Sequence, residues 1–524
     1  MADLLVNEGT RRTAQNKQAR PEQVENSAGG YVFEIPKMEQ AKRFLILGTT
    51  SPTYYASAQT LTAENAAVVR ELANNDGLAF LELIKDVSVN GRAKTQNPTI
   101  FSLAACCAST DNETRREALA LIPVVCRTGT HLFMFAKYIE QFRGWGRALR
   151  TAVGKWYDRT HPGEVAYQVV KYRNREGWTH RDLLRVCHVK PSGASSDLLR
   201  YIVKGDLSGT PDIVHSFHRA QEATTADVWV REITEHRLPW ECLPDAALAV
   251  PAVWEALVPH MGMTALVRNL GRITKVCELN QFSQLTKEIA SRLSDEQAVV
   301  KSKVHPMAVL IGSTTYVMGH GVKGSLSWTP VASITDALED AFMAAFGSVQ
   351  GAGKNTLLAL DVSGSMAGPG IAGTFLSPRA ASAAMAMVTL RSEPAVEVMA
   401  FSSGFVPLSI TARSSLQDIV RTVSNMPFDR TDCAVPMLSA LHNNLPIDTF
   451  VIYTDNETWC GRMHPFQALE AYRQKSGRDA RLAVVGMTAT NFSIANPKDP
   501  GMLDFVGFDA AAPEAIRAFS AREF

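Results

Sequence analysis

Five oxygen-bearing side chains in the last third of the sequence have the types and spacing of a divalent-metal site. Asp361, Ser363 and Ser365 occupy alternate positions of one D-x-S-x-S segment, so a tight loop can turn their oxygens to one point. Thr431 follows, and Asp455 stands directly after an apolar run. Hydroxyl and carboxylate oxygens suit Mg²⁺ or Mn²⁺ rather than zinc. The alternative is that the two aspartates only cap helices that follow strands.

A second set of candidate residues is basic. Residues 127–190 contain 13 lysines and arginines but only five acidic residues, although the whole chain is nearly neutral, with 53 basic and 52 acidic side chains. Lys171 and Arg175 are four apart, which predicts neighbours on one helix face. Together with His188 and Lys190 they are candidates to grip a phosphate backbone, and the interleaved aromatic residues could stack on unpaired bases. The alternative is an ordinary solvated helix face.

The metal candidates need a sheet to position them. Short apolar runs alternate with helical stretches after residue 350, which predicts a parallel, doubly wound α/β sheet. Ligands in this architecture bind outside the carboxyl ends of the strands, where Asp361 and Asp455 would lie. The expected strands are 356–361, 396–401, 449–455 and 481–486, and the expected helices between them include 377–391 and 465–475.

The basic candidates lie in a long helical region. Capping-box spacings at Thr110–Glu113 and Ser294–Gln297 mark helix starts, and strict alternation of apolar residues is rare between about 37 and 345. Short helices joined by polar turns predict an α-solenoid, in which each unit packs only on its neighbours. We therefore expect three parts, namely a loosely ordered N-terminal arm over 1–30, a helical region over 31–350 and an α/β domain over 355–524.

Composition restricts the class of protein further. With 46% hydrophobic residues among 524, the chain is not wholly disordered. Eight cysteines without a CxxC pair indicate reduced thiols, and neither a secretory signal nor an apolar run of membrane-spanning length is visible, so we expect a cytoplasmic protein without a membrane partner. The basic block contains no paired carboxylates, and we find no phosphate loop or nucleophile elbow. We predict that the protein is not an enzyme.

Many short blocks, in one order, carry a resemblance over residues 35–524. They include Arg43-Phe-Leu-Ile-Leu-Gly48, Gly144-Trp-Gly-Arg-Ala-Leu-Arg150, Arg268-Asn-Leu-Gly271, His305-Pro306 and Thr454-Asp-Asn-Glu-Thr458. The sequence resembles the TROVE-family Ro (SS-A) ribonucleoproteins, which implies a helical HEAT-repeat ring closed by a von Willebrand factor A domain. The five oxygen-bearing residues then match the metal-ion-dependent adhesion site of that domain, although Asp429 and Arg430 before Thr431 depart from the small residues that are common there.

The resemblance also implies ligands. Small noncoding Y RNA would bind the outer surface of a monomeric ring through Lys171, Arg175 and His188, and single-stranded 3′ ends of misfolded or unprocessed RNA would enter its hole. In bacterial members the Y RNA is expected to tether polynucleotide phosphorylase. Candidates for the inner wall are Arg127, His131 and Arg147.

An alternative function comes from a different class. The A domain would capture an acidic group of a partner protein through its metal, and the helices would serve only as a scaffold. The chain would then be a metal-dependent protein-binding adaptor.

Overall fold

The computed structural model describes most of the chain. The described residues are 12–48, 58–93, 95–158, 161–190, 195–321, 324–347, 349–367, 376–427 and 429–523. Within them, no helix is both long and apolar enough to cross a membrane.

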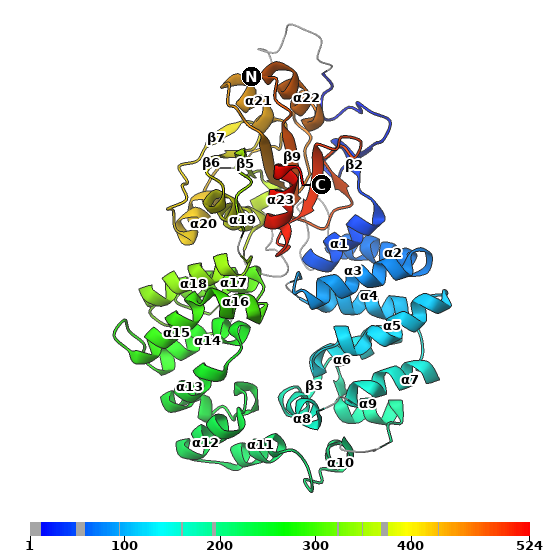
Figure 1. Cartoon of the computed structure of the whole chain (residues 1–524), viewed down its shortest axis with the longest axis vertical. Helices are drawn as coiled ribbons and strands as arrows, with labels where there is room; N and C mark the ends of the chain where they lie inside the picture. Colours follow the sequence, from blue (N-terminus) through cyan, green and yellow to red (C-terminus); the bar gives the residue numbers. More distant parts are fainter. Residues whose placement is uncertain are drawn as a thin grey trace.

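In the part of the chain that the structure describes, eighteen helices form a ring below an α/β domain (Figure 1). The chain descends along one side from α1 to α9, crosses at α10 and α11, and returns along the other side from α12 to α18. The helices are α1 (Lys37–Leu47), α2 (Ala58–Asn75), α3 (Gly77–Val89), α4 (Asn97–Cys107), α5 (Asn112–Val125), α6 (Gly129–Phe142), α7 (Arg147–Gly154), α8 (Pro162–Lys171), α9 (His180–Cys187), α10 (Ser196–Lys204), α11 (Asp212–Glu222), α12 (Ala226–His236), α13 (Pro251–Leu257), α14 (Met263–Val276), α15 (Gln284–Ser294), α16 (Glu296–Ser302), α17 (Pro306–Met318) and α18 (Ala332–Ala344).

Two of these helices begin one residue later than the capping-box spacing predicts. Asp111 caps α5 by accepting a hydrogen bond from the Thr114 amide at 2.7 Å. Asp295 likewise caps α16 through the Ala298 amide at 3.0 Å. An aspartate side chain is a strong N-cap, so the position that carries it sets the start of each helix.

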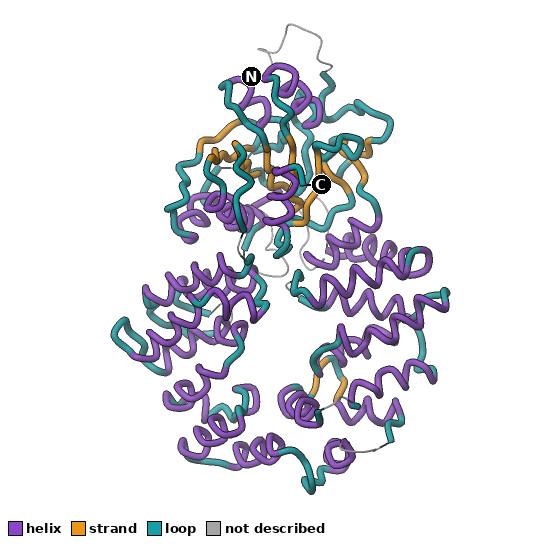
Figure 2. Tube along the Cα trace, viewed as in Figure 1, coloured by secondary structure: helices purple, strands orange, loops and turns teal. Residues whose placement is uncertain are grey.

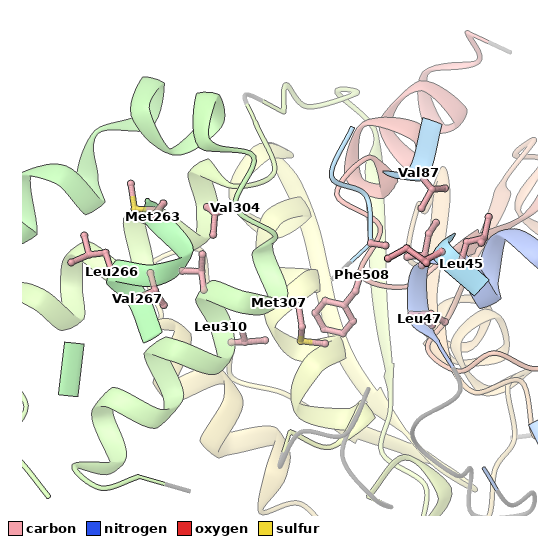
Figure 3. Close-up of a cluster of buried hydrophobic side chains, with 14 of the residues drawn as sticks. Leu45, Leu47, Val87, Met263, Leu266, Val267, Val304, Met307, Leu310 and Phe508 are labelled. Carbon is pink, nitrogen blue, oxygen red and sulfur yellow. The ribbon is translucent and has the colours of Figure 1, made fainter. Parts of the chain in front are cut away.

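Direct contacts close the ring next to the α/β domain. Arg92, after α3, donates through Nε to Asp509 Oδ1 at 3.0 Å, and its backbone carbonyl lies 3.0 Å from His305 Nε2, before α17. Phe508 belongs to the same buried apolar cluster as Leu45 and Met307, and Figure 3 shows its ring between side chains from the two ends of the helical region. The two ends of the helical region are therefore held to each other and to the domain above them.

The α/β domain contains a six-stranded sheet with the strand order β11-β9-β8-β5-β6-β7. All neighbours pair in parallel except the edge strand β7. Figure 2 shows the sheet between helices. The strands are β5 (Asn355–Asp361), β6 (Ala395–Phe401), β7 (Phe405–Pro407), β8 (Thr449–Thr454), β9 (Arg481–Gly486) and β11 (Met502–Val506), and the helices are α19 (Pro378–Ser392), α20 (Leu416–Ser424), α21 (Val435–His442), α22 (Pro465–Ser476) and α23 (Ala512–Ala521). The predicted fold class, a helical ring with an A-type α/β domain, is confirmed.

The N-terminal segment differs from the loosely ordered arm that we expected. Its described part, residues 12–34, packs on the α/β domain through β1 (Gln23–Glu25) and β2 (Tyr31–Glu34), and β2 pairs with β10 (Phe492–Ser493). The segment is polar, but several of its polar side chains are buried and bond to the domain, Gln15 among them. The polar composition suggested disorder because a sequence does not show which residues of the domain these side chains bond to.

Candidate functional site

The five predicted metal ligands come from the carboxyl edge of the sheet and are buried. Asp361 is the last residue of β5, and Asp455 follows the parallel neighbour β8. Asp361 Oδ1 accepts from the Ser363 amide at 2.9 Å and Oδ2 accepts from Thr454 Oγ1 at 2.7 Å. The hydroxyls of Ser363 and Ser365 lie 3.0 Å apart. The tight loop after β5 therefore has the compact form that the spacing predicted.

Burial makes this site a poor place for two negative charges. Burial and then the charge of Asp455 raise the pKa of Asp361 to about 7, and burial also raises the pKa of Asp455. The Thr431 hydroxyl is buried and makes no hydrogen bond within the described part of the chain. An unsatisfied hydroxyl and two destabilised carboxylates are the features that a bound divalent cation would stabilise.

Helix capping does not explain the two aspartates. The long helices that follow β5 and β8 are α19 and α22, and their N-cap residues are Ser377 and His464. Asp455 Oδ1 instead accepts from the Glu457 amide at 3.0 Å, within its own loop.

Sequence reasoning missed a third carboxylate beside these residues. Glu457 is fully buried, and burial followed by the charge of Asp455 raises its pKa to about 8. Its Oε2 accepts from the Ala28 amide at 3.2 Å, so the N-terminal segment covers it. The Thr454–Thr458 block contained the residue, but nothing in its spacing indicated burial.

The two unusual residues before Thr431 are exposed at the rim. The Arg430 guanidinium lies over the Trp459 ring, 5.5 Å from its centroid, and Asp429 Oδ2 accepts from Ser403 Oγ at 2.5 Å. Arg430 is thus held on an aromatic ring next to the loop of Thr431.

The basic candidates fall into separate places. His188 and Lys190, both exposed, line a hollow of about 230 Å³ together with Arg150 and Lys155. His188 ends α9 in the left-handed conformation, with φ of 52°, which turns the chain toward this hollow. The structure therefore brings two predicted residues together with two cations from α7 and the turn after it.

A second hollow continues from the first. Its volume is about 710 Å³, and it lies between α5 and α7 with Arg147 and Lys155 on its lining. Thr151 and Lys155 line both hollows. Arg147, which we expected on an inner wall, thus lies on one continuous surface with His188. We call Arg147, Arg150, Lys155, His188 and Lys190 the α7–α9 surface.

Lys171 and Arg175 do not share a helix face, so that prediction is wrong. Helix α8 ends at Lys171, and Arg175 stands in β3 (Asn174–Arg175), which pairs with β4 (Trp178–Thr179). The turn between these strands uses positive φ at Glu176 and Gly177, 55° and 83°. Arg175 is exposed, with Nε 3.7 Å from Glu176 Oε1.

Lys171 is largely covered by its own neighbours. Its Nζ lies 3.5 Å from Glu241 Oε1 and 5.3 Å from the ring centroids of Tyr167 and Tyr172. Burial would lower the pKa of the ammonium, but Tyr167, Tyr172 and Glu241 together raise it above its usual value. The charge of Lys171 is therefore held within the fold.

Arg127 is exposed but bonds within the fold, and His131 is partly buried. Arg127 Nη1 donates to Ser88 Oγ at 2.9 Å. Burial, with the nearby Arg127 charge, lowers the pKa of His131 to about 4. His131 is therefore neutral near pH 7 and carries no charge for a phosphate.

Comparisons with known proteins agree with this architecture. The family model of the TROVE domain matches residues 24–225 and 233–314, and that of the Ro60 vWA domain matches residues 355–520. The chain is 40% identical over 509 residues to the RNA-binding protein RO60 of Deinococcus radiodurans, covering 96% of each chain. It is 34% identical to the RNA-binding protein RO60 of Caenorhabditis elegans, covering 96% of this chain and 91% of the relative. The crystal structure of the Deinococcus radiodurans Ro (RSR) protein superposes with a TM-score of 0.71 at 39% identity, covering 93% of this chain and 100% of that chain.

Proposed function

Because the chain belongs to the TROVE-domain Ro60 family, we propose that it is a noncatalytic RNA-binding protein. Its ligands are a small structured RNA of the Y RNA type and the single-stranded 3′ ends of misfolded or unprocessed RNAs. The role is RNA quality control, in which the small RNA also tethers a processing exonuclease such as polynucleotide phosphorylase.

The observation that carries this proposal is the α7–α9 surface. Arg147, Lys155, His188 and Lys190 are exposed, and none of the four forms an ion pair with any residue that the structure describes, unlike neighbouring Lys137 and Arg175. Arg147, Lys155 and Lys190 are thus unpaired cations on this surface, which attract a phosphate backbone and release its condensed counterions. By contrast, exposed Arg116 on α5 is already paired with Glu117.

The ring supports a preference for RNA ends. A closed ring admits a single strand only from a free end, while an attached duplex stays outside on the basic surface. Single strands are held by phosphate contacts and stacking, which tolerate most sequences. The protein would thus select RNAs with a structured body and an unpaired 3′ tail.

One binding experiment tests this preference. A stem-loop with a 3′ tail of several nucleotides is compared with the same stem-loop carrying an equal 5′ tail and with a blunt one, at one salt concentration. We expect the 3′-tailed RNA to bind most tightly. Equal affinity for all three would contradict threading and leave only surface binding.

The metal assignment is a separate part of the proposal. Asp361, Ser363, Ser365, Thr431 and Asp455 would hold Mg²⁺ or Mn²⁺, and the unsatisfied Thr431 hydroxyl supports this donor set. The ion would supply an electrophilic position for an acidic group of a partner. The hydroxyl-rich donor set thus favours one part of the adaptor alternative, in which the α/β domain docks a partner protein through its metal. Calorimetric titration of the full chain with each ion tests it.

A further inference from the structure

A buried glutamine of the N-terminal segment joins the two loops that carry Thr431 and Asp455. The Gln15 side chain is fully buried. Its Nε2 donates to Asp432 Oδ1 at 2.7 Å and to the Met463 carbonyl at 2.8 Å. Its Oε1 accepts from Thr458 Oγ1 at 2.6 Å and from the Gly461 amide at 3.2 Å. One side chain thus satisfies four groups of the domain.

These contacts lie next to the metal ligands on both loops. Asp432 is adjacent to Thr431, and Thr458 is three residues beyond Asp455. The loops also bond to each other, because the Thr431 carbonyl accepts from the Trp459 amide at 3.2 Å and from the Cys460 amide at 3.3 Å. Gln15 adds a bridge between side chains of the same two loops.

Close packing leaves no room for a side chain at two glycines where the segment meets the domain. A Cβ atom on Gly461 would lie 2.4 Å from both Asp432 Oδ1 and Gln15 Nε2. Farther along the segment, a Cβ atom on Gly30 would lie 1.9 Å from the Thr458 carbonyl oxygen. Asn26 Nδ2 donates to that carbonyl at 2.9 Å. The segment is therefore fitted to the loop after Asp455 at two separate places.

We propose that Gln15 is a positioning residue for the metal centre. It holds the Thr431 loop and the loop after Asp455 at the spacing that one divalent cation requires. This inference rests on the proposed metal binding. Because the segment continues into α1, which begins at Lys37, it also attaches the metal centre directly to the first helix of the ring.

Gln15→Leu tests the inference, because leucine keeps the volume and removes all four bonds. Gln23→Leu is the matched control. Gln23 is 4% exposed in the same segment and makes four bonds of its own, to Ala19, Arg20 and Tyr31 of the segment and to the His464 ring. His464 ends the loop after Asp455, but no bond of Gln23 joins that loop to the Thr431 loop. Loss of a residue that orients metal ligands typically weakens metal affinity about 10- to 100-fold.

We expect that loss in the Mn²⁺ and Mg²⁺ dissociation constants of Gln15→Leu, measured by calorimetry on the full chain. Gln23→Leu should keep the wild-type constants. Both variants should lower the melting temperature without metal, but only Gln15→Leu should reduce the rise in melting temperature that metal produces. A purely structural role would leave that rise equal in the two variants.

Thr458→Val is the second variant, in case Gln15→Leu does not fold. It removes one hydroxyl, which lies 2.6 Å from Gln15 Oε1, accepts from the Cys433 amide at 3.0 Å and lies 3.5 Å from the Thr431 carbonyl. It should also weaken metal binding. Wild-type affinity in the folded variants would overturn the positioning role. Failure of the wild-type protein to bind either ion would instead overturn the metal centre, and this inference with it.

Discussion

The α7–α9 surface and the metal centre place charge in opposite ways. Exposed cations on the first have no ion pair within the described residues, whereas Asp361 and Asp455 of the second are buried side by side. Each solvated cation contributes a modest part of the free energy of binding to a long polyanion, nearly independently of the other cations. A buried ligand set acts as a unit, because the remaining carboxylate and hydroxyls cannot replace a missing donor. The comparison therefore predicts graded losses of RNA affinity for substitutions in the ring. It predicts all-or-none losses of divalent-ion affinity for substitutions of the metal ligands in the α/β domain.

The largest expected effect is at the metal centre. Asp361→Ala removes one of two ligand carboxylates, so we expect divalent-ion affinity to fall at least about 100-fold, more than for a residue that only orients ligands. Calorimetric titration with Mg²⁺ and Mn²⁺ measures it. Glu470→Ala, which removes an exposed carboxylate on α22, is the control for loss of a charge. Wild-type titration by Asp361→Ala would show that the five residues are not the ligands.

A smaller, graded loss is expected on the ring. Lys155→Ala with His188→Ser removes two residues of the first hollow without touching the core, so structured-RNA affinity should fall about tenfold at physiological salt. The slope of log affinity against log salt should become shallower by about one for the lysine contact. Lys475→Ala, an exposed lysine on α22, is the control. An unchanged slope and affinity in the double variant would remove the α7–α9 surface from the RNA site.

The smallest expected effect is a change in the pH dependence of folding stability, and it arises in the helical region. Burial lowers the pKa of His180, at the start of α9, to about 4, and its Nδ1 lies 2.9 Å from the Tyr157 hydroxyl. Because the folded pKa lies below the unfolded value of about 6.5, the unfolded chain binds the extra proton first. Stability is therefore full above pH 6.5 and falls as the pH drops toward 4.

Melting curves of wild type and His180→Phe between pH 7 and 4 measure this dependence. The variant should be less stable at pH 7, because the Tyr157 hydroxyl loses its partner, but its stability should fall less steeply with acid. Equal slopes for the two proteins would show that His180 is not the titrating group.

The sequence predicts the place of a residue well when that place depends on its own strand or helix, and poorly when it depends on residues far away in the chain. Asp361 and Asp455 could be placed because apolar runs end at them and parallel strands bring their ends together. Arg175 could not, since helical spacing from Lys171 ignores a hairpin turn that Gly177 makes possible with positive φ. Gln15 was hidden for a related reason, because its bonds reach residues more than 400 positions away.

The measurement that tests the central claim most directly is RNA affinity in the two kinds of variant. A 3′-tailed stem-loop, labelled for fluorescence anisotropy, is titrated with wild type, Asp361→Ala and the Lys155→Ala, His188→Ser double variant in the presence of Mg²⁺. If the ring alone holds RNA, Asp361→Ala should bind like wild type and the double variant more weakly. A loss of RNA affinity in Asp361→Ala as large as in the double variant would contradict the division between the two regions.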